Sequence, residues 1–154
     1  MTNKKTPTPV TPSGEASMTF EAVLICDQVR REDNAKLLFI GVYTDIVNVS
    51  RLPFPINLTL VAQVRVMEAG SFRFNVNVTD PLGNNVVEGL AGEGRYEGEE
   101  GRTAWFPIAL PPFVMSAEGE YVARIDFDGG LGRSERFVVR KLIPPVQPIT
   151  SAPN

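Results

Sequence analysis

The sequence predicts an all-β protein, an antiparallel β-sandwich of about 7–9 strands of the immunoglobulin-like or C2-like type. Three observations favour this class. Apolar and polar residues alternate in successive short runs, Gly, Pro and Asn separate those runs, and no stretch keeps a helical period over three turns. A β-barrel is the second choice, because it has the same alternation and turn spacing.

The clearest strand is residues 71–79, where Phe72, Phe74, Val76 and Val78 alternate with polar residues. In the first strand the same period predicts that Phe20, Ala22, Leu24 and Cys26 share one face. Thr103 to Leu110 is also strand-like, but Pro107 predicts that this strand lies at a sheet edge or ends early. The predicted strands are residues 19–29, 36–43, 56–67, 71–79, 103–110, 120–128 and 136–142.

Three connections stand out between these strands. Residues 30–36 are predicted to join two consecutive strands, with Asn34 in the left-handed position and Ala35 where a tight turn would prefer Gly. Asp80-Pro81-Leu82-Gly83 has the pattern of a type I turn. Residues 89–101, GLAGEGRYEGEEG, are predicted to be a long acidic surface loop.

The chain is predicted to hold one domain at residues 18–143, between disordered tails at residues 1–17 and 144–154. Both tails are rich in Pro, and the first is also rich in Thr, so neither has much apolar surface to bury. Such tails serve either as docking segments or as solubilising extensions.

Composition excludes several classes of function. The chain has no histidine, so Ser-His-Asp and Cys-His catalysis and His-containing zinc sites are not available in their usual forms. A net charge of −3 argues against binding to nucleic acid or to anionic membranes. One cysteine, no signal peptide and no apolar stretch long enough for a membrane helix together predict a cytoplasmic protein.

Several residues between Leu24 and Tyr43 resemble the opening of an uncharacterised bacterial all-β protein family, a domain of unknown function. The similarity is carried by the runs Leu24-Ile25-Cys26-Asp27, Val29-Arg30, Asp33-Asn34, Lys36-Leu37 and Ile40-Gly41-Val42-Tyr43. It extends over residues 18–142, and it departs from the family pattern where Ala35 replaces the Gly of the turn. The resemblance implies a fold and assigns no catalytic residue.

Two groups of residues are candidate sites. Loop residues Arg30, Arg31, Glu32, Asp33, Arg95 and Tyr96 are candidates for contact with a partner, since loops carry the binding surfaces of rigid sandwiches. Asp80, Asp126 and Asp128 are candidate calcium ligands, because carboxylates gathered at one end of a sandwich provide hard oxygen donors. Cys26 is interpreted as a small buried apolar residue, or alternatively as a thiol activated by the nearby arginines.

The leading hypothesis from the sequence is a non-enzymatic binding module whose partner is a protein and which needs no cofactor. The alternative is a C2-like module that binds calcium or a small ligand through loop carboxylates. An enzyme of unknown type, using carboxylates, Lys or Tyr, is the third possibility.

Overall fold

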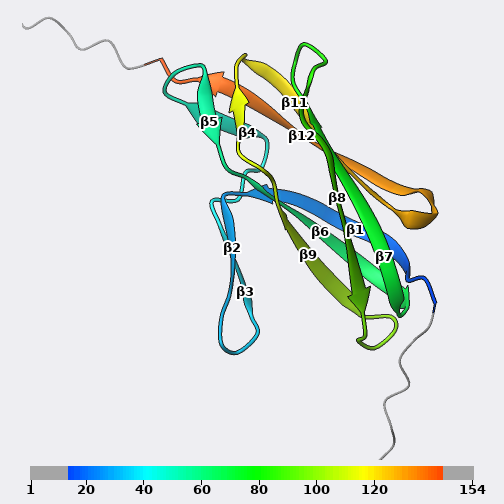
Figure 1. Ribbon diagram of the computed structural model, residues 1–154. Coiled ribbons are helices and arrows are strands. Elements are labelled where there is room, and N and C mark those ends of the chain that lie inside the picture. The colour runs from blue at the N-terminus through cyan, green and yellow to red at the C-terminus, as the bar shows by residue number, and fades with distance from the viewer. Residues whose placement is uncertain (1–13, 144–154) are drawn as a thin grey trace, which may run out of the picture.

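The computed structural model describes residues 14–143, which form two β-sheets packed face to face with a hairpin projecting from one side (Figure 1). Five strands in the order β4-β12-β11-β7-β8 make one sheet, and β1-β6-β9 make the other. Short pairs β5-β10 and β2-β3 complete the fold, and among the strands of residues 14–143 only β4 and β12 pair in parallel. The elements are β1 Ser17–Cys26, β2 Gln28–Arg31, β3 Leu37–Ile40, β4 Ile46–Val49, β5 Phe54–Ile56, β6 Thr59–Glu68, β7 Gly70–Thr79, β8 Asn85–Tyr96, β9 Thr103–Ala109, β10 Phe113–Met115, β11 Gly119–Phe127, the 3₁₀ turn η1 Asp128–Gly130 and β12 Leu131–Lys141.

The structure confirms the all-β sandwich, because the alternating residues of both sheets meet in one core. Leu60, Ala62 and Val64 of β6 are fully buried between the sheets, as are Val76 and Val78 of β7. Towards one end the core becomes aromatic. Its ring centroids lie 4.8 Å apart for Phe72 and Phe106, 5.4 Å for Phe20 and Phe127, and 5.6 Å for Phe72 and Phe127. Each such pair adds about 0.5–1.5 kcal/mol beyond its buried area.

The face predicted for β1 is wrong beyond Phe20. Phe20 pairs with Val64 and Ala22 with Gln63, so the intervening Glu21 is an extra residue in a β-bulge. An inserted residue moves every later side chain to the other face. Val23 and Ile25 therefore belong to the sandwich core, and Cys26 lies on the outer side of the three-stranded sheet.

The loop predicted at residues 89–101 is mostly strand β8, which pairs with β7. Gly94 lies opposite Phe72 and Gly92 opposite Phe74, and a Cβ on either glycine would collide with the facing ring. The two rings occupy the space that β8 side chains would otherwise fill. Glycine here serves close packing, which a sequence pattern cannot distinguish from a flexible loop.

The predicted connection at residues 30–36 is a hairpin turn between β2 and β3, with Ala35 rather than Asn34 in the left-handed conformation. The Ala35 amide donates to the Glu32 carbonyl at 2.9 Å, and the Glu32 amide donates to the Lys36 carbonyl at 2.9 Å. Asn34 instead accepts a hydrogen bond from the Lys36 amide through its side chain. This is a type I turn followed by a bulge residue at positive φ, usually Gly.

The turn at Asp80 has the same hydrogen-bond pattern, with Gly83 at the position that corresponds to Ala35. The Asp80 carboxylate accepts bonds from the amides of Leu82 and Asn84 and from the Asn84 side chain. These bonds, first the one from the Asn84 side chain, lower the pKa of Asp80. This confirms the predicted turn, which the Asp80 carboxylate stabilises.

Backbone hydrogen bonds to β7 begin at Gly14, slightly before the predicted domain boundary at residue 18. The Ser71 amide donates to the Gly14 carbonyl at 3.0 Å, and the Ala16 amide donates to the Ser71 carbonyl at 2.8 Å. Residues 1–13 of the first predicted tail and the whole of the second, residues 144–154, lie outside the described residues. Across residues 14–143, no helix has the length and apolar character needed to cross a bilayer.

Replacing Ala35 by Gly is expected to raise the free energy of unfolding by about 0.5–1 kcal/mol. Relief of the left-handed strain of an L-residue exceeds the extra entropy of Gly in the unfolded chain. Urea unfolding, followed by the fluorescence of Trp105, checks this. The reciprocal control is Gly83→Ala, where Gly has φ +86° and open space around it, so a loss of about 1 kcal/mol is expected. A neutral or destabilising A35G would contradict the turn geometry.

Candidate functional site

The β2–β3 hairpin is anchored to the three-stranded sheet through Asp27, at its base. The Asp27 amide donates to the carbonyls of Ile40 and Gly41, and the Tyr43 amide donates to the Ile25 carbonyl at 2.9 Å. The Tyr43 hydroxyl donates to Asp27 Oδ1 at 2.5 Å. Burial, together with the Asp27 carboxylate, raises the pKa of Tyr43 to about 12. Asp27 thus forms both backbone and side-chain hydrogen bonds, and these fix the direction in which the hairpin leaves the sheet.

Glycine is required at position 41 of this anchor. Gly41 has φ +65°, and a Cβ there would overlap the Asp27 carboxylate. The Cys-Asp pair and the Ile-Gly-Val-Tyr run, separated in the sequence, are therefore parts of one structural unit. This explains why the two motifs occur together in the first strands of the chain.

The hairpin lies against the outer face of the three-stranded sheet. Phe39 of β3 packs on Trp105 of β9, with ring centroids 5.1 Å apart. Val61 and Cys26 on this outer face are fully buried although neither belongs to the core between the sheets. The Cys26 thiol donates to the Thr59 carbonyl, and burial raises its pKa, which disfavours the thiolate. This supports the interpretation of Cys26 as a packing residue.

A hollow of about 620 Å³ lies between the hairpin and β9. Arg31 and Lys36 line its hairpin side, and no carboxylate is among the described residues that line it. Neither cationic side chain has a hydrogen-bond or ion-pair partner within residues 14–143. The lining residues are Arg31, Ala35, Lys36, Leu37, Phe39, Tyr96, Thr103, Ala104, Trp105 and Phe106. The hollow is thus aromatic and positively charged.

A second hollow, of about 500 Å³, continues along β9 between the edges of the two sheets. Phe72, Phe74 and Phe106 contribute its aromatic surface, and Leu90 and Ile108 add aliphatic surface. The two hollows share Phe106, and every residue of β9 from Thr103 to Ala109 lines one or both. We call the pair the edge groove.

The floor of the edge groove includes an unpaired strand edge. The Leu110 amide donates to Leu58, and Val66 donates to Arg102, so even-numbered β9 residues point their backbone groups at β6. The amides and carbonyls of Thr103, Trp105 and Ala109 therefore point away from β6. Pro107 falls in the same outward series and lacks an amide hydrogen. Of the two predicted alternatives, a strand at a sheet edge or one that ends early, the structure shows the edge strand.

The Thr103 side chain is fixed from the outer face. Its hydroxyl donates to Glu21 Oε2 at 2.9 Å, and Arg65 Nε donates to Glu21 Oε1 at 2.9 Å. The bonds from Thr103 and Arg65, in that order, lower the pKa of Glu21. One carboxylate thus connects all three strands at the end of the groove next to the hairpin tip.

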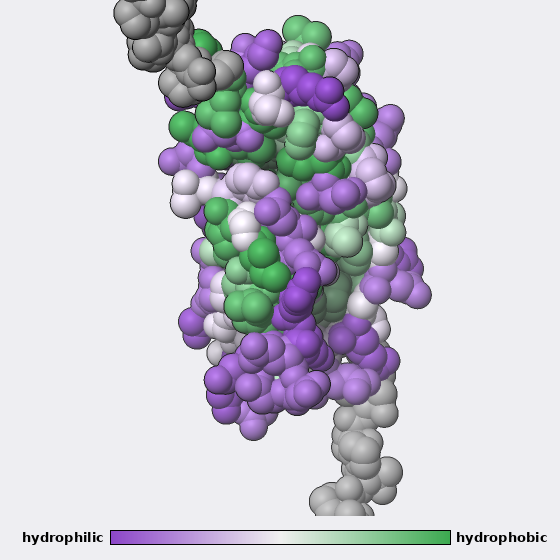
Figure 2. Space-filling view, turned by 90° about the vertical axis from the view of Figure 1, so that its left-hand side faces the viewer, coloured by the Kyte–Doolittle hydropathy of each residue, from purple (hydrophilic) through white to green (hydrophobic). Residues whose placement is uncertain are grey.

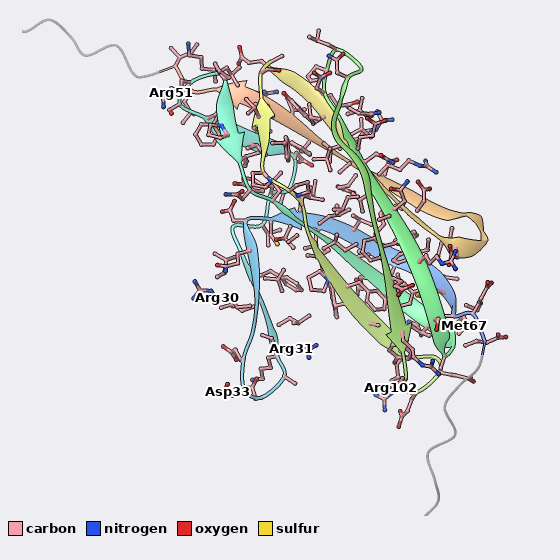
Figure 3. All side chains as sticks on the ribbon, in the orientation of Figure 1. Arg30, Arg31, Asp33, Arg51, Met67 and Arg102 are labelled. Carbon is pink, nitrogen blue, oxygen red and sulfur yellow. The ribbon has the colours of Figure 1, made fainter. Side chains whose placement is uncertain are left out.

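The predicted interaction residues divide into two groups. Arg31 and Tyr96 line the hollow beside the hairpin, and Arg95 lines the second hollow. Arg30 points to the opposite side of the hairpin from Arg31, as strand alternation requires (Figure 3). Glu32 and Asp33 are exposed at the tip and line neither hollow.

On the face shown in Figure 2, the lower end is polar and apolar side chains gather directly above it.

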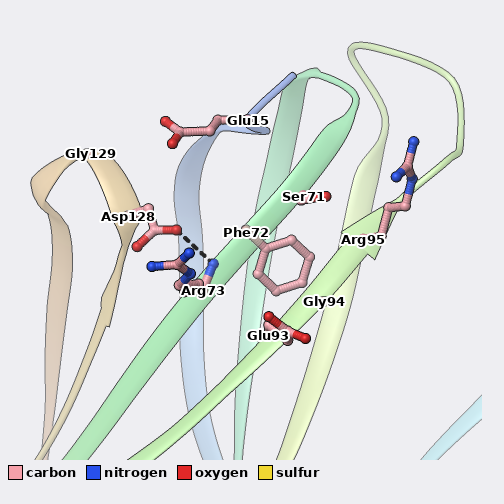
Figure 4. A pocket seen from close by; sticks show the side chains of 9 residues that line it. All are labelled: Glu15, Ser71, Phe72, Arg73, Glu93, Gly94, Arg95, Asp128 and Gly129. Carbon is pink, nitrogen blue, oxygen red and sulfur yellow. Dashed lines mark hydrogen bonds between the residues drawn. The ribbon is translucent and has the colours of Figure 1, made fainter. Parts of the chain in front are cut away.

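Another hollow, of about 660 Å³, lies beside the outer face of the five-stranded sheet (Figure 4). Arg73 and Arg95 line it together with the carboxylates of Glu15, Glu93 and Asp128. Asp128 is engaged here, since its Oδ2 accepts a hydrogen bond from the Arg73 amide at 2.8 Å. Cations and carboxylates are mixed over this surface, so its charge favours no particular class of ligand.

The three candidate calcium ligands are not brought together. Asp80 follows the end of β7, whereas Asp128 is bonded to Arg73 near the start of that strand, about 23 Å away at 3.3 Å per residue. Asp126 forms an ion pair with Arg124 at 2.6 Å. Within the described residues, no group of three His, Cys, Asp or Glu side chains has the geometry of a metal site.

Sequence reasoning missed Lys36, Phe39 and Trp105 as site residues. Trp105 is only partly buried and faces the hairpin. For Trp105 the available signal was Pro107, because a proline within a strand marks a sheet edge. Trp105 lies two residues before Pro107 on the same edge strand. No comparable signal placed Lys36 or Phe39 beside β9.

Comparison with known proteins gives a family but no activity. A family model described as "Family of unknown function (DUF6941)" matches residues 21–140, which is more than half of the chain. The match includes the anchor, the hairpin and the whole edge groove. No curated protein matches the chain.

Stability is expected to fall as the pH rises from 10 to 12, and less steeply in a Tyr43→Phe variant. The pKa of Tyr43 is raised by folding, so its contribution is complete below pH 10 and is lost as the phenol ionises near pH 12. Denaturant unfolding at several pH values, with absorbance titration of the phenolate, measures both effects. If Y43F and the wild type lost stability in parallel, the Asp27–Tyr43 bond would not be the cause.

Millimolar calcium is expected to leave the thermal unfolding midpoint unchanged, because Asp80 lies far from Asp126 and Asp128. Differential scanning fluorimetry in calcium and in EDTA measures this. A rise above about 2 °C that is abolished in an Asp126→Asn/Asp128→Asn variant would instead establish a calcium site at η1. An Asp80→Asn variant is the matched control, since it should lower the midpoint equally with and without calcium.

Proposed function

The chain belongs to the Family of unknown function (DUF6941), and we propose that it is a non-enzymatic interaction module whose protein partner binds in the edge groove. The observation that carries this proposal is the length of the groove. It follows β9 from its first to its last residue and is bounded by the hairpin at one end. A surface of this shape fits a segment of polypeptide better than it fits a compact small molecule.

The chemistry of the lining supports contact rather than catalysis. Trp105, Tyr96, Phe39 and Phe106 give large rigid apolar surfaces, and Arg31 adds a cation that forms directional hydrogen bonds. Tryptophan, tyrosine and arginine are the residue types that contribute most binding energy at protein interfaces. The side of the groove beside the hairpin brings no carboxylate, thiol or histidine among its described residues, so the usual acid–base pairs of catalysis are not offered there.

The rigidity of the site supports the same proposal. The hairpin is held by the Asp27 anchor, Phe39 packs on Trp105, and Glu21 connects the three strands beneath the groove. A preformed site loses little conformational entropy when a partner binds. The hairpin can therefore act as a fixed wall of the groove.

Site-specific photo-crosslinking in cells that make the protein tests the proposal. The photoreactive residue p-benzoyl-phenylalanine is placed at Ala109, an exposed residue of β9 that lines the groove. The matched control carries it at Asn48, an exposed residue of β4 at the edge of the other sheet. Crosslinks to a protein from Ala109 and not from Asn48 are expected. Equal crosslinking from both positions, or none from Ala109, would contradict binding in the groove.

A further inference from the structure

We propose that the partner presents an extended acidic segment that pairs with the free edge of β9 as an additional strand. This inference rests on the proposed function and specifies the chemistry of the ligand. Acidic and apolar residues would alternate along the partner's segment, and its backbone would form hydrogen bonds with β9. Three independent features of the edge groove support it: the unpaired backbone, the unpaired cations and the apolar space between the sheets.

The backbone of β9 offers hydrogen bonds at defined positions. Thr103 and Trp105 direct an amide and a carbonyl away from β6, and none of these four groups has a partner in the described structure. Proteins usually block such edges to prevent uncontrolled pairing. Here Pro107 removes a donor from the second half of β9, and the first half, beside the hairpin, stays available.

Arg31 and Lys36 specify the charge of the segment. Both side chains line the hollow beside Thr103 and Trp105, and both are without partners in the described residues. A carboxylate on the added strand would complement them, whereas a basic segment would be repelled. The preference for acidic residues arises from these two cations, because the net charge of the whole chain is −3 and would repel an acidic ligand at long range.

The second hollow explains why apolar residues would alternate with acidic residues along the ligand segment. Side chains of an added strand point in turn to its two faces, one towards the opposite sheet and one towards the outside. On the inner side, the rings of Phe72, Phe74 and Phe106 line the space between the sheets. Phe72 is buried, whereas Phe74 and Phe106 are only partly buried, and Gly92 of β8 faces Phe74 without a side chain. Apolar residues at every second position of the segment would fill this space.

The proposal is tested by selecting from a phage-displayed library of random 12-residue peptides on the immobilised full chain. Binding of selected synthetic peptides is then measured through Trp105, the only tryptophan of the chain and a residue of the groove. Acidic peptides with apolar residues at alternate positions are expected. The Arg31→Glu/Lys36→Glu variant should bind them at least about tenfold more weakly. The control Arg133→Glu/Arg140→Glu changes the net charge equally on exposed positions of β12 and should not.

Backbone pairing has a second, independent readout. Methylation of successive peptide amides should weaken binding at every second position, because only alternate amides of an added strand face β9. Pro107→Val restores an outward donor on β9 and should tighten binding several-fold. If methylation weakened binding without a period of two and P107V had no effect, strand addition would be wrong even for an acidic ligand.

The outcomes separate this inference from the proposed function. Selected peptides that perturb Trp105 but are basic or rich in proline would refute the acidic strand and leave a binding groove. A library that yields no peptide competing at Trp105 would count against both. Acidic peptides that bind wild type and R31E/K36E equally would refute the roles of Arg31 and Lys36 and with them the inference.

Discussion

Burial of the first residues of β6, Thr59 to Ala62, on both faces of the strand is the constraint on which the rest of the structure depends. Leu60, Ala62 and Val64 are buried between the sheets, and Val61 is buried on the opposite side. A sandwich covers only one face of each sheet, so the outer face of the three-stranded sheet needs a second cover. The β2–β3 hairpin packs on that face through Phe39 and Trp105. Apolar burial thus positions the element that becomes a wall of the edge groove.

The edge groove arises where aromatic core residues lie between the edge strands β8 and β9. Phe72 and Phe74 lie over glycines of β8 instead of meeting side chains of equal size, so their rings border the space between the edges of β8 and β9. The same aromatic residues that stabilise the core therefore line the groove in which we propose that the partner binds. The Asp27 anchor sets the direction of the hairpin, and Glu21 holds the strands below it. Stability and the proposed binding site share these contacts.

The strands with strict alternation were predictable from the sequence, and the structure shows where that signal ends. Residues 71–79 alternate without interruption and form β7 almost exactly as predicted. In β1 a bulge at Glu21 reverses the faces, because one extra residue is invisible to a pattern that assumes an unbroken pairing. In β8 glycines that pack under phenylalanine rings look the same in the sequence as glycines of a mobile loop. In both cases the neighbouring strand decides what the residue does.

By itself the sequence determined the fold class and the turn at Asp80, and it restricted the strand that contains Pro107 to a sheet edge or an early end. Local periodicity, turn chemistry and a missing amide hydrogen are properties of a few consecutive residues. Its resemblance to a family gave the motifs that contain Asp27, Gly41 and Tyr43, but the structure showed that they form one unit. Only the tertiary structure brought Arg31, Lys36, Phe39 and Tyr96 to β9 and separated Asp80 from Asp126 and Asp128. Those relations join residues far apart in the chain, and they depend on strand order and register, which no single strand encodes.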